Sequence, residues 1–260
     1  MTNGKATTSN RYSRIAVITG ASSGIGEATA RKLVAVGYGV VGNARNAEKL
    51  QALEKELGKA FCGVAGDAAE NAVQERLFDA AKEYFGRDAD IVVVNAGRGL
   101  GGSVKDAELS KFEEVLRLNV AGALALMQMA AQKMLPEQQA SFPKRAADIV
   151  ILGSVVGRNA SPFSAVYGAT KFAVHGLAEG LRREVGPKGI RVSLVEPGIV
   201  LSGFQDGAGY SDELVHNFEE KFGPLLYGAD IANAIYFIVS HPPHIHVSDI
   251  VVRPTRQDYP

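Results

Sequence analysis

The sequence predicts an α/β fold, a doubly wound parallel sheet of seven strands with helices on both faces. Two observations support this prediction. Short apolar runs alternate with helix-length segments along the chain. Most of the runs are continuously apolar, which is typical of strands that helices cover on both faces. Because no linker, internal repeat or change of composition divides residues 14–260, we expect them to form a single domain.

The expected strands are Arg14–Gly20, Gly37–Arg45, Ala60–Asp67, Asp90–Gly97, Asp148–Ser154, Ile190–Gly198 and Ser248–Pro254. The segments expected to be helical are Ile25–Val36, Ala47–Leu57, Asn71–Tyr84, Ser110–Met134, Val166–Val185 and Ala229–Val239. This alternation is what a sheet built from strand–helix–strand units requires.

Three segments interrupt the alternation. The N-terminal residues are polar and basic without any acid, a bias shared by transit peptides. Because the stretch is short and nearly free of apolar residues, we expect a flexible tail over residues 1–13 instead. Residues 135–147 are polar and contain prolines, which predicts a surface loop. Residues 199–226 follow the end of a strand, the edge where open α/β sheets bind ligands, so we expect them to form a lid over a substrate.

The composition limits the classes of protein to consider. Hydrophobic residues make up 46% of the chain, enough for a full core. Lys+Arg and Asp+Glu balance at 28 each, which gives no support to nucleic-acid binding. The single cysteine, Cys62, excludes an internal disulfide and suits a cytoplasmic location. No apolar stretch approaches the roughly 20 residues of a membrane span, and we expect no bound metal ion.

A glycine-rich turn follows the first strand, in the sequence TGASSGIG from Thr19 to Gly26. Glycines allow the turn to tighten and the backbone to approach a diphosphate, and the N-terminus of the next helix offers free N–H groups. Ser22 and Ser23 add hydroxyl donors. The alternative is a flexible strand–helix loop, but this combination favours phosphate binding.

Tyr167 and Lys171 are four residues apart and therefore lie on the same helical face. A surface pair with buried stems is the alternative. A phenol has an ordinary pKa near 10, too high for ready proton exchange at neutral pH. A lysine ammonium one turn away stabilises the phenolate and should lower that pKa, which predicts an acid–base pair.

Taken in order, these motifs resemble the short-chain dehydrogenase/reductase family. The residues that carry the resemblance are TGASSGIG, the NAG at Asn95–Gly97, Asn119, Ser154, the Tyr-x-x-x-Lys at Tyr167–Lys171 and the EPG at Glu196–Gly198. The resemblance covers about Arg14 to Pro254. It departs from the family at Val94, where an asparagine is common, and at Ser202, where a threonine is common. Neither departure removes a catalytic group.

The resemblance implies a Rossmann fold and a set of roles. Tyr167 would exchange a proton with the substrate oxygen, Lys171 would also hold the nicotinamide ribose, and Ser154 would bond that oxygen. Asn119 would hold a helix carbonyl and a water that relay protons to Lys171; alternatively it bonds its own backbone. The expected cofactor-binding residues are Gly20, Ser22, Ser23, Gly24, Ile25, Gly26, Arg45, Asp67, Ala68, Asn95, Ala96, Gly97, Tyr167, Lys171, Pro197, Gly198 and Val200.

The residues after the second strand predict NADP rather than NAD. Ala44 stands where NAD-preferring relatives have an aspartate, and Arg45 follows. A guanidinium can bind a 2′-phosphate through two bonds, and Asn43 and Asn46 are further possible donors. The alternative is that Arg45 is a solvated arginine opening the next helix. Asp67 resembles the family's adenine-contacting aspartate.

The sequence therefore predicts an NADP(H)-dependent oxidoreductase that interconverts a small aldehyde or ketone and its alcohol. Two alternatives are a non-catalytic NADP sensor and an isomerase or dehydratase acting on a sugar nucleotide. The intact Asn119–Ser154–Tyr167–Lys171 set argues against the sensor. The short remainder after Gly198 argues against the isomerase, whose relatives have a sizeable C-terminal domain.

The expected substrate is neutral or has at most one carboxylate. The C-terminal sequence DIVVRPTRQ resembles a bacterial branch that includes serine/3-hydroxy-acid dehydrogenases and clavulanic-aldehyde reductases. The lid contributes the apolar residues Phe204, Tyr210, Leu214, Phe218 and Phe222, and the acids Asp206, Asp212, Glu213, Glu219 and Glu220 against Lys221 alone. Such a surface does not suit a polyanion, although the acids can equally face solvent. Arg158 is either a partner for a substrate carboxylate or a loop arginine.

Gly176 and Gly180 share a face of the helix that carries Tyr167. Each costs about 1 kcal/mol relative to alanine, so a close contact should compensate. In the resembled family this helix packs against its twin, which implies a homo-oligomer, a tetramer or a dimer. A close approach to the chain's own sheet is the alternative.

Overall fold

The computed structural model describes residues 12–162, 164–202 and 211–259. Its main feature is a parallel sheet of seven strands in the order β3-β2-β1-β4-β5-β6-β9. The strands are β1 (Ile15–Thr19), β2 (Gly39–Ala44), β3 (Phe61–Ala65), β4 (Ile91–Val94), β5 (Ala147–Leu152), β6 (Ile190–Pro197) and β9 (Asp249–Val252). All seven predicted strands are confirmed, and the order reverses at β1, between β2 and β4.

Burial along the strands follows their place in the sheet. Every residue of β1, β2, β4, β5 and β6 is buried, whereas the edge strands β3 and β9 are only partly buried. The continuous apolar runs in the sequence therefore have a physical cause, because helices cover both faces of the central strands.

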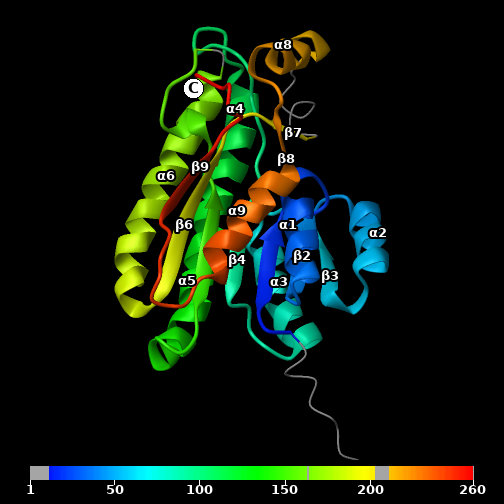
Figure 1. Cartoon of the computed structure of the whole chain (residues 1–260), viewed down its shortest axis with the longest axis vertical. Coiled ribbons are helices and arrows are strands. Elements are labelled where there is room, and N and C mark those ends of the chain that lie inside the picture. Colours follow the sequence, from blue (N-terminus) through cyan, green and yellow to red (C-terminus); the bar gives the residue numbers. More distant parts are fainter. Residues whose placement is uncertain (1–11, 163, 203–210, 260) are drawn as a thin grey trace, which may run out of the picture.

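The helices form two layers, each with its own hydrophobic core (Figure 1). One layer contains α1 (Gly24–Ala35), α2 (Ala47–Leu57) and α9 (Gly228–Ser240). The other contains α3 (Asn71–Phe85), α4 (Leu109–Leu116), α5 (Ala123–Ser141) and α6 (Ala165–Val185). The doubly wound single domain predicted from the sequence is thus confirmed.

One predicted helix and one predicted loop are wrong in detail. The expected helix Ser110–Met134 is divided into α4 and α5 by a π-helical segment, Arg117–Gly122. The expected loop 135–147 is helical up to Ser141, since α5 continues through Pro136. Proline removes one helical hydrogen bond, but tertiary contacts hold this end: Gln138 Nε2 donates to Arg145 O at 2.8 Å and Gly189 O at 2.9 Å.

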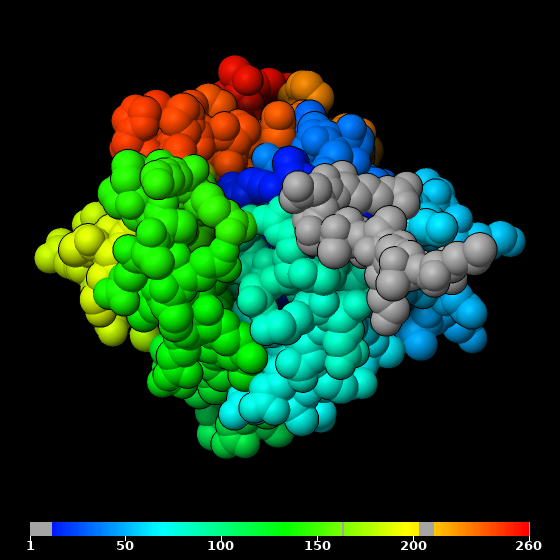
Figure 2. Space-filling model, turned by 90° about the horizontal axis from the view of Figure 1, so that it is seen from below, coloured from blue at the N-terminus to red at the C-terminus, as the bar shows by residue number. Residues whose placement is uncertain are grey.

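Buried ion pairs lie at the end of the sheet where the strands begin. Asp148 accepts two hydrogen bonds from Arg191, at 2.7 and 2.8 Å, and also pairs with Arg14 at 2.7 Å. Arg191 further donates to the carbonyls of His241, Pro242 and Ile245. Figure 2 shows this end from below, where the segment after α9 (orange) lies beside the ends of α5 and α6 (green and yellow). These bonds fasten that segment to β5 and β6.

Most of the predicted N-terminal tail, residues 1–11, lies outside the described residues. Of its remaining two residues, Tyr12 is anchored, because its hydroxyl donates to Lys59 O at 2.7 Å and its ring packs against Phe85. No helix in the described ranges is long and apolar enough to span a membrane.

Two short strands frame the segment expected to form the lid. β7 (Val200–Leu201) pairs in parallel with β8 (Leu226–Tyr227), and α8 (Asp212–Phe222) lies between them in the chain. In Figure 1, α8, β7 and β8 lie at the top, where the strands of the main sheet end. Phe204, Asp206 and Tyr210 lie outside the described residues. The remaining lid acids, Asp212, Glu213, Glu219 and Glu220, are exposed, which supports the alternative that they face solvent.

Candidate active site

The glycine-rich turn between β1 and α1 is shaped as a phosphate cradle requires. Gly20 and Gly24 have φ angles of 69° and 53°, a region that other residues rarely adopt. A Cβ on Gly26 would lie 2.2 Å from Gly20 O, so only glycine allows the helix to approach the turn so closely. Ser23 is the N-cap of α1, which begins at Gly24. The free N–H groups at the N-terminus of this helix therefore belong to the same turn and can bind a phosphate.

Two side chains of neighbouring strands hold this turn. Thr19 Oγ1 accepts hydrogen bonds from the amides of Asn95 and Ala96, both at 3.1 Å. Asn95 Nδ2 donates to Thr19 O at 2.8 Å. The predicted Asn95–Gly97 segment therefore lies directly beside the glycine turn, at the switch point between β1 and β4 where open sheets bind ligands.

Arg45 lies exposed in the turn between β2 and α2. The two neighbouring asparagines, which the sequence offered as further donors, have structural roles. Asn43 is buried and donates to Val64 O and Gly66 O, at 3.0 and 3.1 Å. Asn46 caps α2 by accepting from Lys49 N. The cation is thus available to a ligand at the sheet edge, while Asn43 has used both of its donors.

Asp67 follows β3 and pairs with a residue of the π-helical segment. Its Oδ1 accepts from Ala69 N at 3.0 Å, and its Oδ2 pairs with Arg117. Burial opposes ionisation of Asp67, but the hydrogen bonds from Arg117 and Ala69 outweigh it, and the pKa of Asp67 is lowered. Ala68 lies between Asp67 and Ala69 in the chain, and its carbonyl accepts a hydrogen bond from Gln74 Nε2.

Tyr167 and Lys171 both lie buried on the first turns of α6. Lys171 Nζ donates to the carbonyl of Leu152, the last residue of β5, at 2.7 Å. The same nitrogen lies 5.8 Å from the centre of the Tyr167 ring. Burial lowers the pKa of Lys171 to about 8. The alternative of a surface pair is therefore excluded, because both side chains are buried and Lys171 is bonded to the C-terminal end of β5.

Ser154 lies two residues after β5 and begins a short 3-10 turn, Val155–Gly157. Its Oγ accepts from Val156 N at 3.4 Å, and its amide donates to His175 Nε2 at 3.2 Å. Because Lys171 binds Leu152 and Ser154 is two residues further on, α6 and the end of β5 bring Ser154, Tyr167 and Lys171 to one place.

Asn119 lies buried within the π-helical segment. Its Oδ1 accepts from Arg98 N at 2.9 Å and its Nδ2 donates to Arg98 O at 2.9 Å. The same Nδ2 also donates to Thr170 Oγ1 at 3.2 Å, and Thr170 lies between Tyr167 and Lys171 on α6. The alternative that Asn119 bonds the backbone of its own helix is wrong, since these bonds reach the loop after β4 and the tyrosine–lysine helix.

The segment after β6 reaches back to the glycine turn. Pro197 ends β6, and Gly198 N donates to Val252 O at 2.7 Å. Val200 begins β7, and two residues later Ser202 approaches the turn: a Cβ on Gly24 would lie 3.1 Å from Ser202 Cβ. The predicted Pro197–Val200 element thus lies at the same edge as the other site residues.

Sequence reasoning missed four side chains that support this site: Thr19, Thr170, His175 and Glu196. Thr170 and His175 had a signal, since they lie on α6 beside Lys171 and one turn beyond it. Glu196 belongs to the EPG motif, but the motif does not predict that its carboxylate is fully buried and paired with Arg158. Arg158 is therefore a loop arginine held by Glu196, the second of the two readings that the sequence left open.

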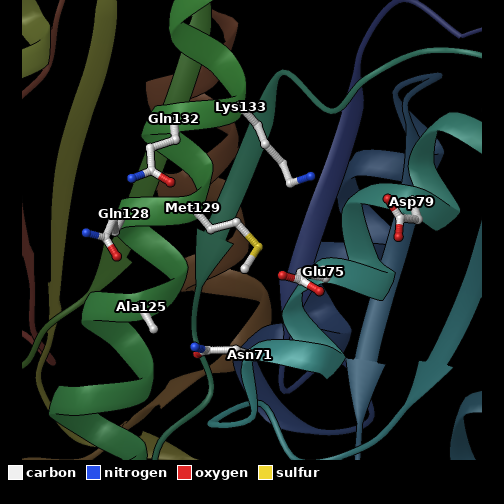
Figure 3. Close-up of a pocket in the computed structure, with 8 residues that line it drawn as sticks. All are labelled: Asn71, Glu75, Asp79, Ala125, Gln128, Met129, Gln132 and Lys133. Atoms are coloured by element: carbon white, nitrogen blue, oxygen red, sulfur yellow. The ribbon is translucent and has the colours of Figure 1, made fainter.

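A separate groove of about 480 Å³ lies between α3 and α5. Figure 3 shows the residues that line it, Asn71, Glu75 and Asp79 from α3 and Ala125, Gln128, Met129, Gln132 and Lys133 from α5. None of them belongs to the predicted site.

The fold and the site define the class of protein: an α/β domain with a dinucleotide-type cradle at β1 and a tyrosine–lysine pair at the same sheet edge. The family model described as short chain dehydrogenase matches residues 14–210. The chain belongs to this family of oxidoreductases.

Relatives cover nearly the whole chain. Serine 3-dehydrogenase from Agrobacterium fabrum is 35% identical over 245 residues, covering 94% of both proteins. Serine 3-dehydrogenase from Rhizobium radiobacter is 33% identical over 245 residues, again covering 94% of both. The branch predicted from the C-terminal sequence is thus confirmed.

Solved structures agree with the fold. The closed form of serine dehydrogenase complexed with NADP+ has a TM-score of 0.84 at 26% identity, covering 94% of this chain and 96% of that one. The 3-ketoacyl-(acyl-carrier-protein) reductase from Brucella melitensis complexed with NADH has a TM-score of 0.83 at 27% identity, covering 94% and 98%.

Proposed function

We propose that this protein is an NADP(H)-dependent oxidoreductase that interconverts a small aldehyde or ketone and the corresponding alcohol. The observation that carries the proposal is the buried pair on α6. A lysine ammonium beside a buried phenol, at the end of the sheet where the glycine turn lies, is suited to proton exchange.

In carbonyl reduction, Tyr167 donates its proton to the substrate oxygen, and the Lys171 ammonium stabilises the phenolate that remains. Ser154 Oγ donates a hydrogen bond to the same oxygen as negative charge develops on it. Bound NADPH supplies the hydride. Asn119 keeps α6 aligned through Thr170 and the loop after β4.

The glycine turn fits a dinucleotide, because a side chain at Gly20 or Gly24 would strain the backbone and one at Gly26 would clash with Gly20 O, which would prevent this close turn. The predicted residues of this turn would hold the cofactor together with Asp67, Ala68, Asn95, Ala96, Gly97, Tyr167, Lys171, Pro197, Gly198 and Val200. Arg45 supports NADP over NAD, since its exposed guanidinium can bind a 2′-phosphate and no carboxylate ends β2. Among the solved structures, the serine dehydrogenase is complexed with NADP+ and the 3-ketoacyl reductase with NADH, so the choice of NADP rests on Arg45.

The substrate is proposed to be small and neutral, or to have a single carboxylate. Serine, the substrate named for the serine dehydrogenases, is such a compound, and these relatives match 94% of this chain. Arg158 contributes no free cation, since Glu196 holds it.

The test is oxidation of NADPH with three carbonyl compounds: a neutral aldehyde, a 3-oxo acid and a phosphorylated ketone. We expect turnover with one of the first two. Clear preference for the phosphorylated ketone would contradict the substrate class. No turnover with any carbonyl compound, together with tight NADPH binding, would favour the non-catalytic sensor.

Tyr167→Phe is the decisive variant. It removes only the transferable proton, so we expect the fold and NADPH affinity to remain while the rate of reduction falls about 100-fold or more. Circular dichroism and fluorescence titration with NADPH serve as controls. Substantial residual turnover would show that Tyr167 is not the proton donor.

A further inference from the structure

The His175 ring lies directly beneath the segment that carries Ser154. A Cβ on Gly153 would lie 2.3 Å from His175 Nε2, and a Cβ on Gly157 would lie 2.4 Å from His175 Cε1. Both distances are far below normal contact, so only glycines on the two sides of Ser154 leave room for the ring. The backbone of Gly153–Gly157 and the His175 ring are therefore in close contact, with no space for a side chain at either glycine.

A hydrogen bond joins the ring to the backbone of the serine. Ser154 N donates to His175 Nε2 at 3.2 Å. Burial, with Lys171 and Arg158 nearby, lowers the pKa of His175 to about 4, and the ring is neutral at pH 7. Since Nε2 accepts a hydrogen bond, the single ring proton lies on Nδ1.

The other side of the ring faces a buried carboxylate. His175 Nδ1 lies 3.6 Å from Glu196 Oε2, and Glu196 is fully buried. Arg158 binds both oxygens of Glu196, with Nη2 to Oε1 at 2.6 Å. A fixed negative charge beside Nδ1 favours the tautomer that leaves Nε2 free to accept from Ser154.

The order glutamate, histidine, serine resembles a hydrolase triad, but the contact differs. In such a triad the histidine bonds the serine hydroxyl and removes its proton. Here the histidine bonds the serine amide, while Oγ accepts from Val156 N. The ring therefore holds the backbone of Ser154 and does not activate its hydroxyl.

We propose that His175, locked by Glu196 and Arg158, is a positioning residue that fixes the segment Gly153–Gly157 so that Ser154 Oγ meets the substrate oxygen. The proposal rests on the proposed carbonyl chemistry of Ser154 and Tyr167. It gives a role to the cluster of His175, Glu196 and Arg158, which takes no part in the proton transfer itself.

The first test compares His175→Leu with His175→Gln. The apolar side chain cannot accept from the Ser154 amide, whereas a glutamine carbonyl reaches about the place of Nε2. We expect His175→Leu to lower kcat about 10- to 100-fold, since a small misplacement of a reacting group has that effect. NADPH affinity should stay unchanged, and His175→Gln should recover most of the loss. Equal loss in both variants would contradict the proposal.

A double-mutant cycle with Ser154→Ala separates positioning from general support of the fold. If His175 acts through Ser154, His175→Leu should lower kcat no further in the Ser154→Ala background. If the ring merely stabilises the domain, the same factor should be lost again. The second result would overturn the proposal.

A variant that keeps the histidine provides a further check. Gly157→Ala places a methyl group against the ring and should reduce kcat as His175→Leu does. Gly186→Ala is the matched control, because a Cβ there meets nothing within 4 Å. If Gly157→Ala retains full kcat, the fit between segment and ring has no role in the reaction. This comparison remains available should His175→Leu fail to fold.

Nitrogen NMR of the His175 ring tests the geometry without any turnover. We expect a neutral ring protonated on Nδ1 at pH 7, with a Ser154 amide that is protected from exchange. A proton on Nε2 would refute the proposal. Absence of turnover in the wild-type protein would instead refute the proposed function, and the ring spectrum would still decide the arrangement of His175.

Discussion

Lys171 and His175 lie one turn apart on α6, and burial lowers the pKa of both side chains, to about 8 and about 4. At pH 7 the lysine is therefore mostly a cation and the histidine is neutral. Each state matches its partner, because the Leu152 carbonyl accepts from an ammonium and the Ser154 amide donates to a neutral ring. One helix thus presents a charged donor and an uncharged acceptor to the same end of β5.

The stability of the protein should depend on pH through His175. Its pKa of about 4 lies below the ordinary 6.5, so between these values the unfolded chain binds a proton that the folded protein does not. Stability present above pH 6.5 is therefore lost as the pH falls toward 4, by at most about 3 kcal/mol. Urea unfolding at several pH values measures this loss.

The variant His175→Gln should unfold with a weaker dependence on pH over that range. His216→Gln is the control, because His216 is exposed on α8. If His216→Gln changes the pH dependence as much as His175→Gln does, the histidine under Ser154 is not its source.

The residues of the site were predictable from the sequence to different degrees. Tyr167 and Lys171 belong to one helix, so their spacing alone places them on one face. Arg158, His175 and Glu196 come from a loop, a helix and a strand, and only the fold brings them together. No local pattern contains such a cluster, so the sequence alone does not decide between the two roles considered for Arg158.

At the scale of elements, apolar composition predicted the strands well and helix boundaries less well. The central strands are buried on both faces, so their sequence is continuously apolar. The π-helical segment Arg117–Gly122 has no such signal, since its residues suit an ordinary helix. Its contacts are tertiary: Asn119 binds the loop after β4, and Gly122 O accepts from Gln74.

The turn between β2 and α2 should decide the choice of cofactor. Arg45 is exposed there, and Ala44 ends β2 without a carboxylate. We expect the wild-type protein to prefer NADPH over NADH. Arg45→Ala should raise the KM for NADPH about 10-fold, the loss of one charge-assisted contact, and leave the KM for NADH unchanged.

Steady-state kinetics with both cofactors measure this ratio. Arg76→Ala is a control, because Arg76 binds Ala65 O at 2.7 Å beside the same sheet edge. An unchanged NADPH/NADH ratio in Arg45→Ala would show that another residue selects the cofactor. A wild-type preference for NADH would refute the prediction directly.

The ion pairs at the other end of the sheet should support stability and not catalysis. Asp148 is almost fully buried between Arg191 and Arg14. Asp148→Asn keeps the shape but leaves the buried Arg191 without its carboxylate partner and leaves Arg14 with Asp90 alone, which should destabilise the protein by about 3–5 kcal/mol. Thermal or urea unfolding measures the change.

Asp88→Asn removes an exposed pair with Lys82 and is expected to change stability by less than about 1 kcal/mol. Equal effects of Asp148→Asn and Asp88→Asn would mean that the buried network does not hold the segment after α9 to β5 and β6.

At the scale of the whole molecule, the polar residues of the proposed active site and the buried ion pairs lie at opposite ends of the sheet. Lys171, His175 and Glu196 lie where the strands end, and Arg14 and Asp148 lie where they begin. This division is common in α/β proteins, because loops after the strands can vary around a site while the other end holds the layers together. Changes to the segment expected to form the lid should therefore alter the preference for substrate more readily than the fold.

The side of the molecule formed by α4, α5 and α6 has features of a subunit contact. Leu116, Leu124 and Phe172 are between 39% and 47% exposed on these helices. A Cβ on Gly176 or Gly180 would meet nothing within 4 Å, so the alternative that these glycines approach the chain's own sheet is wrong. An exposed apolar surface with helical glycines is typical of helices that pack against another copy.

We therefore expect a homo-oligomer in which α6 packs against α6 of a second copy. Gly180→Leu should shift the species seen by light scattering toward the monomer, because the new side chain would separate helices that approach closely at that point. Gly186→Leu is the matched control, since its Cβ also meets open space but lies past the end of α6. A monomeric wild-type protein at micromolar concentration would contradict the prediction. Equal shifts in both variants would show that the contact lies elsewhere.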